Sequence, residues 1–410
     1  MNIGIVTTWF ERGAAYVSRQ YLNALKNNHH VFIYARGGEH HTIENSSWDN
    51  KNVTWGKKTD LEVPMAIDLR DFKKWILRNN LDLVFFNEQQ WWRPVLLCEE
   101  LGIKTGAYVD YYTENTIPLF NIYDFLICNT KRHYNVFKWH SHCYYIPWGT
   151  DTNLFYPKNY NPVKNGIVTF FHSCGMSPDR KGTDILIKAF SQLQRRSRLI
   201  VQTQVDLSEV FPRLNKIIEN LRKSKYLEIY HKTVPAPGLY HLGDVYVYPS
   251  RLDGIGLTII EALASGLPVI TSDNPPMNEF IDDTNGLKIK ISYLYSRSDG
   301  YYWPQCETDI SDLVNKMEYY IKQIDKIPVF KRKARCYAEE NLNWGNNSKK
   351  LSSIFKNVTK NATVDKMVAK EMVAKYEKKR ETFRLKLYDK SPYLLDLVMK
   401  VSSIINKFLR

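Results

Sequence analysis

The sequence predicts an α/β protein with two doubly wound parallel sheets. Strands alternate with helices in two successive series, which is the pattern of parallel sheets covered by helices. The length of 410 residues suits two domains of ordinary size. A hydrophobic content of 44% and an aromatic content of 13% support two sizeable cores. We therefore expect two α/β domains along the chain.

The first series begins at the N-terminus. Its strands are expected at 2–7, 31–35, 81–86, 105–109 and 124–129, with helices at 16–26 and around 94–101. The second series begins near residue 166. Its strands are expected at 167–172, 198–204, 227–230, 244–248 and 268–271, and its helices at 184–195, 238–242, 257–265, 310–323 and 329–342. Asp309 is a suitable N-cap for the helix at 310–323.

The stretch 244–281 reads as strand, glycine loop, helix and strand. Gly254 and Gly256 allow the loop backbone to approach a ligand closely. The helix that follows presents free N–H groups and the positive end of its dipole, which together bind anions. Two carboxylates, Asp253 in the loop and Glu261 on the helix, bracket this site. A ligand with both phosphate and sugar hydroxyls, such as a nucleotide-sugar, suits the arrangement.

This segment resembles the donor-binding signature of retaining glycosyltransferases of family 4, which have the GT-B fold of two Rossmann-like domains. Their signature has two acids separated by seven residues. This chain departs from it with Asp253 in place of Glu and Ile255 in place of Phe. The resemblance implies that Glu261 binds the ribose and Asp253 the donor sugar. It also implies that backbone N–H groups near Leu257 and Thr258 hold the phosphates.

A second loop, Gly175–Gly182, follows a strand and precedes a helix. It resembles the family loop whose Arg and Lys neutralise the diphosphate. Lys181 matches the Lys, whereas Met176 occupies the Arg position and Arg180 is the replacement that we expect. Fixed cations suit the chemistry, because the leaving nucleoside diphosphate gains negative charge. The alternative is a solvated basic turn.

The N-terminal series contributes further candidates. Glu11 and Gly13 lie in a loop that resembles the family's glycine loop facing donor phosphate and acceptor, although a simple βα turn is the alternative. Asp110 and Tyr111 follow the strand after which many family members carry a His that touches the donor sugar, and one of the two is expected to take its place. A role in capping the core is the alternative for Asp110.

Three more residues are candidates on the acceptor side. Trp91 and Trp92 suit stacking on a sugar ring, or else they cover the sheet. Glu279 ends a loop that resembles the family's Pro-Glu loop, where it orders the loop or contacts the donor.

The domain limits follow from a stretch at 143–157 that resembles the family's interdomain linker. We expect an acceptor-side domain at 1–155 and a nucleotide-sugar domain at 156–340. The family pattern places a helix at 341–360 that crosses back to the N-terminal domain. A basic helical tail follows at 361–410.

Net charge is +14, and its distribution decides between partners. From Lys356 to Arg410 the chain carries 14 Lys or Arg against 6 Asp or Glu, a net +8. The sequence contains no nucleic-acid-binding module, so we expect no nucleic-acid partner. The tail reads as a helix at 364–387 and an amphipathic segment with apolar residues at Leu394, Leu397, Val401, Ile404, Ile405 and Phe408. It suits an anionic membrane surface, packing on its own N-terminal domain, or a second subunit.

The resemblance implies transfer of a sugar, with retention, from a nucleotide-sugar to a glycan or lipid-linked glycan acceptor. We expect a UDP- or GDP-sugar donor and no cofactor or metal, because no metal-ligand spacing or DxD motif is present. Six scattered cysteines without a CxxC pair indicate a reducing compartment, and we expect a cytoplasmic protein, peripheral on the inner membrane face. The alternatives are a catalytically weak nucleotide-sugar-binding subunit and a GT-B hydrolase or epimerase.

Overall fold

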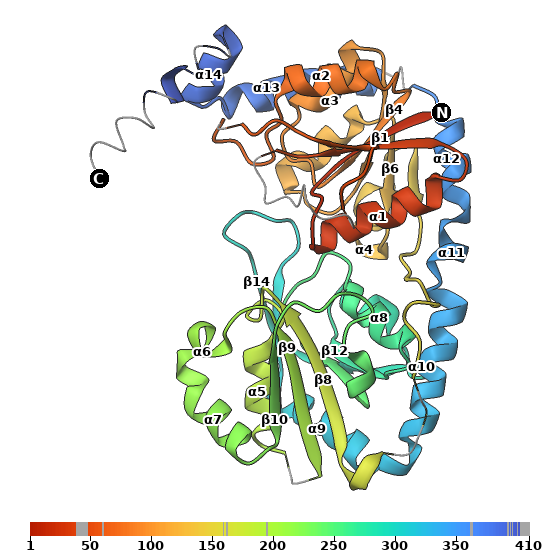
Figure 1. Ribbon diagram of the computed structural model, residues 1–410, viewed down its shortest axis with the longest axis vertical. Helices are drawn as coiled ribbons and strands as arrows, with labels where there is room; N and C mark the ends of the chain where they lie inside the picture. The colour runs from red at the N-terminus through yellow and green to blue at the C-terminus, as the bar shows by residue number, and fades with distance from the viewer. Residues whose placement is uncertain are drawn as a thin grey trace. The chain divides into compact units, whose positions relative to one another are not determined.

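The computed structural model describes residues 1–37, 48–59, 61–158, 160, 163–193, 196–360, 364–391, 393, 395, 397–399 and 401 (Figure 1). The chain divides into two compact units. The first unit contains Met1–Cys128, Val136–Tyr144 and Lys350–Arg410, and the second contains Asn129–Asn135 and Tyr145–Lys349. The expected domain limits at residues 155, 340 and 360 stay predictions.

The first unit is built on a seven-stranded sheet in the order β3-β2-β1-β4-β5-β6-β7. Its strands are β1 Asn2–Thr7, β2 His30–Ala35, β3 Val53–Trp55, β4 Leu83–Asn87, β5 Lys104–Tyr108, β6 Phe125–Cys128 and β7 Cys143–Tyr145. The strands from β3 to β6 pair in parallel. The strand order reverses between β1 and β4, and the carboxyl ends of strands at such a reversal form the usual ligand site of an open α/β sheet.

Helices of the first unit cover this sheet. They are α1 Gly13–Leu25, α2 Leu69–Arg78, α3 Arg93–Glu100, the 3₁₀ helix η1 Glu114–Ile122, α12 Leu351–Asn357, α13 Val364–Lys379 and α14 Phe383–Lys390, and α4 Lys131–Phe137 begins in the second unit. Sequence analysis missed α2. Asp68 caps this helix by accepting from two backbone N–H groups, and Phe72, Trp75 and Ile76 form its buried face.

The second unit contains a six-stranded parallel sheet in the order β10-β9-β8-β11-β12-β13. Its strands are β8 Val168–Gly175, β9 Ser197–Thr203, β10 Leu227–His231, β11 Val245–Tyr248, β12 Val269–Ser272 and β13 Gly286–Ile289. Its α-helices are α5 Thr183–Phe190, α6 Leu207–Val210, α7 Asn215–Lys223, α8 Leu257–Ala264, α9 Ile310–Lys322, α10 Ile327–Asn341 and α11 Trp344–Asn347. The predicted fold class is therefore confirmed. Asp309 caps α9 as predicted, since its side chain accepts from the Asp312 N–H at 2.9 Å.

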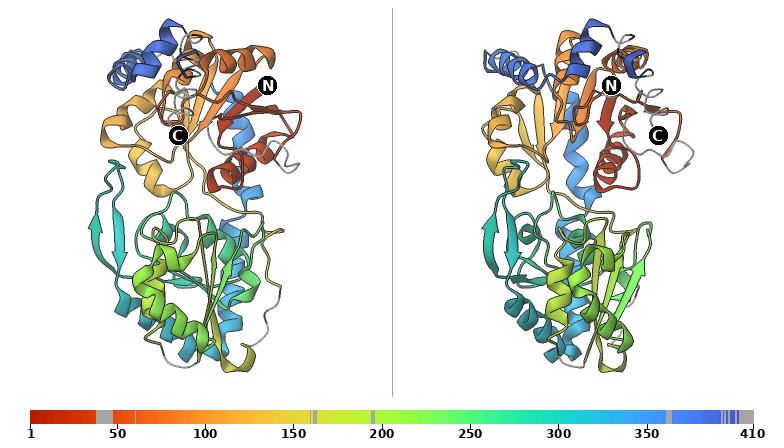
Figure 2. Two further views of the ribbon diagram at one scale, coloured as in Figure 1. Left: turned by 60° about the vertical axis from the view of Figure 1, so that its left-hand side comes forward. Right: turned by 90° about the vertical axis from the view of Figure 1, so that its left-hand side faces the viewer.

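Short 3₁₀ helices complete the second unit. They are η2 Lys164–Gly166, η3 Pro212–Leu214, η4 Tyr240–Leu242, η5 Met277–Phe280 and η6 Ile324–Lys326, and η7 Ser348–Lys350 ends the unit. An antiparallel hairpin of β14 Ile291–Tyr295 and β15 Gln305–Thr308 was not predicted. Figure 2 shows this hairpin standing apart from the parallel sheet.

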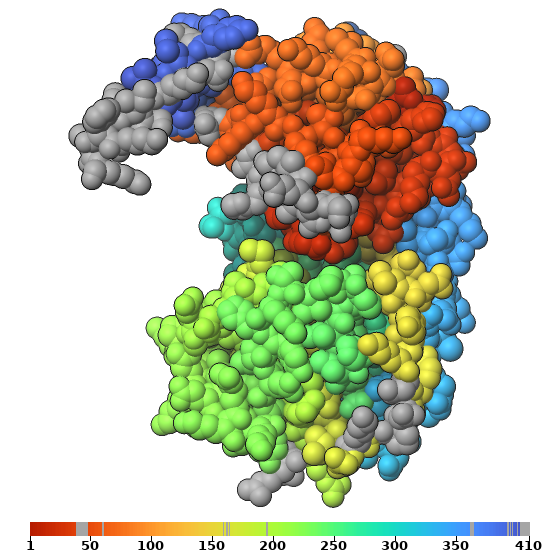
Figure 3. All heavy atoms as spheres, in the orientation of Figure 1, coloured from red at the N-terminus to blue at the C-terminus, as the bar shows by residue number. Residues whose placement is uncertain are grey.

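The C-terminal tail packs on the first unit. The expected single helix at 364–387 is two helices, α13 and α14, because Thr382 starts a new helix by accepting from the Leu385 N–H at 3.1 Å. The hydroxyl of Thr382 also donates to the Leu61 carbonyl at 2.8 Å. In Figure 3 these helices lie against the orange part of the first unit. Packing on the N-terminal unit is thus the alternative that the structure shows for 364–390.

The remainder of the tail is described only at isolated positions, so residues 402–410 of the expected amphipathic segment lie outside the described residues. No helix in the described part of the chain is long and apolar enough to cross a membrane.

Candidate nucleotide-sugar site

The glycine loop of the second unit leads from β11 into the N-terminus of α8, as the sequence predicted. Gly256 has a φ of 91°, which favours glycine, and no side chain caps the helix that begins at Leu257. A Cβ added at Gly254 would meet no heavy atom within 4 Å, so the backbone there borders open space. The backbone of Gly254, Leu257 and Thr258 therefore forms a surface that an anion can approach.

Asp253 lies in this loop within a cluster of opposite charges. Its carboxylate accepts from the Lys181 ammonium at 2.5 Å and from the Arg180 guanidinium at 3.4 Å. The Tyr248 hydroxyl also donates to Asp253, and Lys181 donates to that hydroxyl. Burial acts to raise the pKa of Asp253, but Lys181 and Arg180 outweigh it and hold the pKa well below its usual range. The carboxylate is therefore ionised, and two cations lie beside it.

Lys181 has an unusual pKa for the same reasons. Burial lowers the pKa of its ammonium to about 8, against the opposing effect of Asp253. Both side chains of this pair have an exposed fraction of 13%. The lysine that would neutralise a diphosphate is thus charged at neutral pH and loses its proton in mildly alkaline solution.

Glu261 lies on α8, the helix that follows the glycine loop. Its carboxyl accepts from the Tyr240 hydroxyl at 2.5 Å. Burial raises its pKa to about 7, although Tyr240 and Lys181 act in the opposite direction. The group is therefore balanced between its acid and carboxylate forms, and either form can hydrogen-bond a sugar hydroxyl.

The loop that carries Arg180 and Lys181 is held by an ion-pair network that sequence analysis missed. Arg251 donates to both carboxylate oxygens of Asp184 at 2.7 and 3.0 Å and to Glu307 at 2.8 Å. Asp184 lies on α5 and Glu307 on β15. Arg251, which follows β11, thus links the start of α5 and the hairpin of β14 and β15 to the segment just before the glycine loop. Met176 is exposed and makes no such contact, so Arg180 is the arginine of this loop that reaches the cluster.

Arg132 is a second buried arginine that the sequence did not reveal. Its guanidinium donates to the carbonyl of Asp253 at 2.7 Å and to that of Pro275 at 2.8 Å. It also lies over the ring of Trp303, 5.2 Å from the centroid. Arg132 belongs to no sequence motif, and the two loops whose carbonyls it binds are more than 120 positions away along the chain. The sequence therefore did not indicate its role.

Glu279 orders the chain at the start of α4, which is one of the two roles that its loop suggested, and its acceptor role stays a prediction. Its two carboxylate oxygens accept from the backbone N–H groups of Lys131 and Arg132 at 2.6 and 2.8 Å. Both oxygens are therefore used at the start of α4, where a negative charge also suits the helix dipole.

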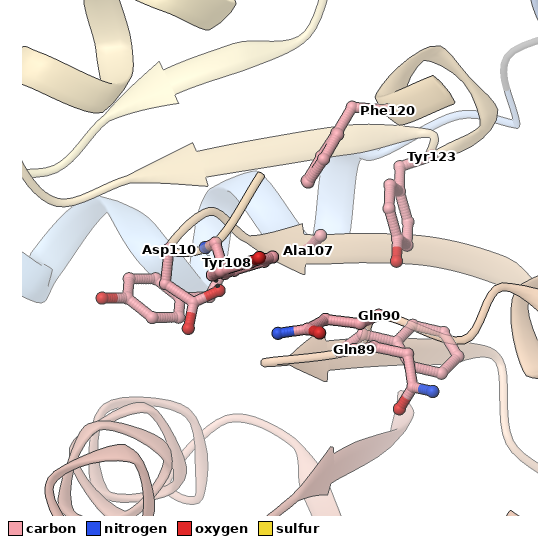
Figure 4. Close-up of a pocket in the computed structure, with 9 residues that line it drawn as sticks. Gln89, Gln90, Ala107, Tyr108, Asp110, Phe120 and Tyr123 are labelled. Atoms are coloured by element: carbon pink, nitrogen blue, oxygen red, sulfur yellow. Dashed lines mark hydrogen bonds between the residues drawn. The ribbon is translucent and has the colours of Figure 1, made fainter. Parts of the chain in front are cut away.

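In the first unit, Asp110 lines a small cavity of about 10 Å³ at the end of β5 (Figure 4). Gln89, Gln90 and Tyr108 line the same cavity, which is about the size of one water molecule. Burial and the nearby Glu88 raise the pKa of Asp110 well above its usual range, although Arg36 and the Tyr111 N–H oppose this. When it is protonated, this carboxyl can donate a hydrogen bond as well as accept one, and its raised pKa favours that form.

Glu11 and Gly13 lie where β1 leads into α1. The Glu11 carboxylate accepts from the Tyr16 hydroxyl at 2.6 Å and from the Trp48 indole at 3.1 Å. Gly13 is the first residue of α1, which no side chain caps. The loop therefore has an ordered carboxylate beside a helix N-terminus.

Trp91 and Trp92 do not form a sugar-stacking surface, which corrects the expected acceptor role. Their exposed fractions are 0% and 3%. The Trp92 ring packs against Phe120 and Tyr123 with centroid distances of 5.2 and 5.7 Å. The alternative that these residues cover the sheet is the one that the structure shows.

The predicted residues thus lie in two groups, one in each unit. The second unit brings Asp253, Arg180 and Lys181 together, with Glu261 on the adjoining helix. The first unit places Asp110 at the end of β5 and Glu11 at the end of β1. Among the described residues, no group of three or more His, Cys, Asp or Glu side chains could hold a metal ion.

Two Rossmann-like units and a glycine loop of this kind define a GT-B protein, and comparison with solved structures confirms that fold. A glycosyltransferase from Rickettsia africae superimposes with a TM-score of 0.69 at 18% identity, covering 88% of this chain and 99% of that one. Anabaena HepE in complex with UDP gives a TM-score of 0.67 at 14% identity, covering 87% and 99%. These likenesses establish the fold.

The second unit also resembles a known family, because residues 168–294 match the family model described as Glycosyl transferases group 1. A probable sucrose-phosphate synthase from Thermosipho melanesiensis is 28% identical over 213 residues, which are 44% of this chain and 50% of the relative. The O-antigen biosynthesis glycosyltransferase WclY of Escherichia coli is 28% identical over 129 residues, covering 31% and 34%. The chain therefore spans half or less of the length of these relatives.

Proposed function

We propose that this protein is a glycosyltransferase that transfers a sugar, with retention, from a nucleotide-sugar to a glycan or lipid-linked glycan acceptor. The observation that carries the proposal is the partly buried cluster of Asp253, Lys181 and Arg180 beside the N-terminus of α8. The cluster and the helix both lie within the stretch that matches the family model. Names of relatives from several organisms, glycosyltransferases and sugar-phosphate synthases, support the same reaction class.

In this proposal the second unit binds the donor. The N–H groups at the start of α8 and the cations of Lys181 and Arg180 receive the diphosphate, while Glu261 hydrogen-bonds the ribose. Asp253 accepts from a hydroxyl of the donor sugar. A UDP- or GDP-sugar is the donor class that we propose, and HepE in complex with UDP and with UDP-glucose supports the first of these.

The proposed chemistry follows from the charges. The bond between the anomeric carbon and the diphosphate oxygen breaks, and its electron pair stays on the diphosphate. The acceptor hydroxyl oxygen forms the new bond to that carbon, and its proton passes to an oxygen of the leaving diphosphate. Lys181 and Arg180 stabilise the negative charge that grows on the diphosphate. This stabilisation of the transition state lowers the barrier to transfer. Asp110 of the first unit is the proposed contact to the reacting sugar.

We also propose that the protein is cytoplasmic and that its acceptor is presented at the inner, anionic face of a membrane. The net +8 of residues 356–410 supports this proposal, because basic segments are attracted to anionic lipids.

Nucleotide release tests the proposed function. Wild-type protein is incubated with UDP-, GDP-, ADP- and dTDP-sugars and compared with Glu261→Ala and Lys181→Ala. Lys223→Ala is the matched control, because it removes an exposed lysine of α7 with a side-chain exposure of 78%. We expect release from one donor, loss in the two site variants and no change in the control.

The opposite result has a specific meaning. Tight nucleotide binding without release, with or without a glycolipid extract as acceptor, would identify a binding subunit instead. Release of free sugar that no acceptor diverts would identify a hydrolase.

A further inference from the structure

The first unit has an open, largely apolar groove of about 450 Å³ between η1 and α13. This volume is typical of small-molecule sites. Its lining residues come from η1, from the end of the segment after α4, and from α13; they are Ile117, Pro118, Asn121, Trp139, Asp365, Val368, Ala369 and Met372.

Ala369 at the base of the groove is buried, with an exposed fraction of 2%, but three larger apolar lining residues are exposed. Trp139, Val368 and Met372 have exposed fractions of 47%, 49% and 39%. Exposed apolar side chains that gather in one concave place usually mark a binding site. The polar groups at the groove are Asn121 and Asp365, which can hydrogen-bond at one end of an otherwise apolar ligand.

One wall of the groove is firmly held. On α13, Lys366 is buried and donates to Asp124 at 2.5 Å and to Glu99 at 2.9 Å. About two turns further along α13, Val373 is fully buried, and one turn beyond it Glu377 accepts from the Trp92 N–H at 3.2 Å. Breaking a buried ion pair is strongly unfavourable, so α13 cannot rotate to bury its neighbouring face. The face with Val368 and Met372 is therefore left open by the packing itself.

The 3₁₀ helix η1 connects the groove to the cavity of Asp110. Phe120 lines that cavity, whereas Ile117 and Pro118, on the same helix, line the groove. Both sites belong to the first unit, the proposed acceptor side. A ligand of the groove thus lies one helix away from the carboxyl that we place at the reacting sugar.

We propose that the groove binds the hydrocarbon chain of a lipid-linked acceptor. This inference rests on the proposed function and narrows its acceptor class to amphiphiles. An apolar lining suits the hydrocarbon chain, and Asn121 and Asp365 can hydrogen-bond hydroxyls at its sugar end. The net +8 of residues 356–410, which include α13, attracts an anionic acceptor to this part of the protein. The tail thus completes an acceptor site instead of serving only as a packing element.

Binding of a fluorescent dodecyl maltoside to the full chain tests this proposal, with methyl maltoside as the competitor that lacks the chain. The variants are Val368→Asp and Met372→Asp. Met367→Asp is the matched control, because Met367 lies on the same helix with an exposed fraction of 68% and does not line the groove. We expect about a tenfold loss of affinity in the two groove variants, since an ionised carboxylate disfavours an apolar ligand. The control should bind as the wild type does.

Three other results would overturn the proposal. Equal affinity for the probe in all variants would show that its hydrocarbon chain binds outside the groove. A dimer in light scattering that Met372→Asp dissociates would show a second copy in the groove. Equal displacement of the probe by neutral phosphatidylcholine and anionic phosphatidylglycerol vesicles would identify bulk lipid as the occupant.

Thermal unfolding of each variant confirms that it is folded, and Val368→Ser repeats the test without adding charge. Nucleotide release in the absence of acceptor separates this inference from the proposed function. If wild type binds the dodecyl probe but releases no nucleotide, binding of an alkyl chain in the groove is supported and the glycosyltransferase proposal fails. Unchanged release in Val368→Asp with lost probe binding would confirm the groove as an acceptor-side site.

Discussion

Replacing Glu261 by Gln should change the pH dependence of stability in a defined way. The substitution keeps the shape of the side chain and leaves an oxygen to accept from Tyr240, but it removes the titrating proton. Any difference in stability that varies with pH then reports the carboxyl itself. Tyr240→Phe is the companion variant, because it removes the hydrogen bond that lowers the pKa of Glu261.

The magnitude follows from the pKa in the two states. The pKa of Glu261 rises from 4.5 to about 7 on folding, with burial as the main cause. Such a change corresponds to about 3 kcal/mol, which we reduce to about 2 kcal/mol because the residue keeps some solvent contact. A raised carboxyl pKa stabilises the fold fully below the unfolded pKa of 4.5, and this contribution is lost as pH rises through about 7.

Urea unfolding at several pH values measures this effect. The wild type should lose about 2 kcal/mol relative to Glu261→Gln between acid and mildly alkaline pH. Tyr240→Phe should shift that loss to higher pH. A constant difference between wild type and Glu261→Gln at all pH values would refute the reasoning, because it would show that Glu261 titrates normally in the folded chain.

Further predictions concern the charged cluster. The pKa of Lys181 is about 8, so nucleotide affinity in a fluorescence titration should fall about tenfold between pH about 7 and about 9, and Lys181→Arg should flatten this dependence. Tyr248→Phe removes a hydrogen bond to Asp253 and should lower kcat/KM about tenfold with normal folding; an unchanged value would remove Tyr248 from the site. Arg132→Lys should cost about 2 kcal/mol in urea unfolding, because lysine cannot reach the Asp253 and Pro275 carbonyls together. Full stability would contradict that role.

Local patterns predicted the parts of the fold that local chemistry determines. The strand, glycine loop and helix around Gly256 and the cap at Asp309 follow from short-range signals, and the structure confirms them. The cluster of Asp253 and Lys181 was predicted only through the family pattern, because the two residues are 72 positions apart.

The features that sequence analysis missed depend on contacts between distant segments. Arg251 and Arg132 carry no motif, and only the fold shows the carboxylates and carbonyls that they join. The buried state of Trp91 and Trp92 likewise follows from Phe120 and Tyr123, which lie some thirty positions further along the chain. Periodicity places a side chain on a face, but it does not reveal what covers that face.

The shorter acid at position 253 bears on whether the site still serves a ligand. An aspartate reaches less far than the usual glutamate, and here the Tyr248 hydroxyl and the Lys181 ammonium meet it. A buried ion cluster adds little stability by itself, because apolar residues of similar volume often stabilise a fold equally well or better. The cluster is thus poorly explained as a packing device. Its cations beside an uncapped helix N-terminus suit an anionic ligand instead, which supports donor binding at this site, and nucleotide release then separates catalysis from binding alone.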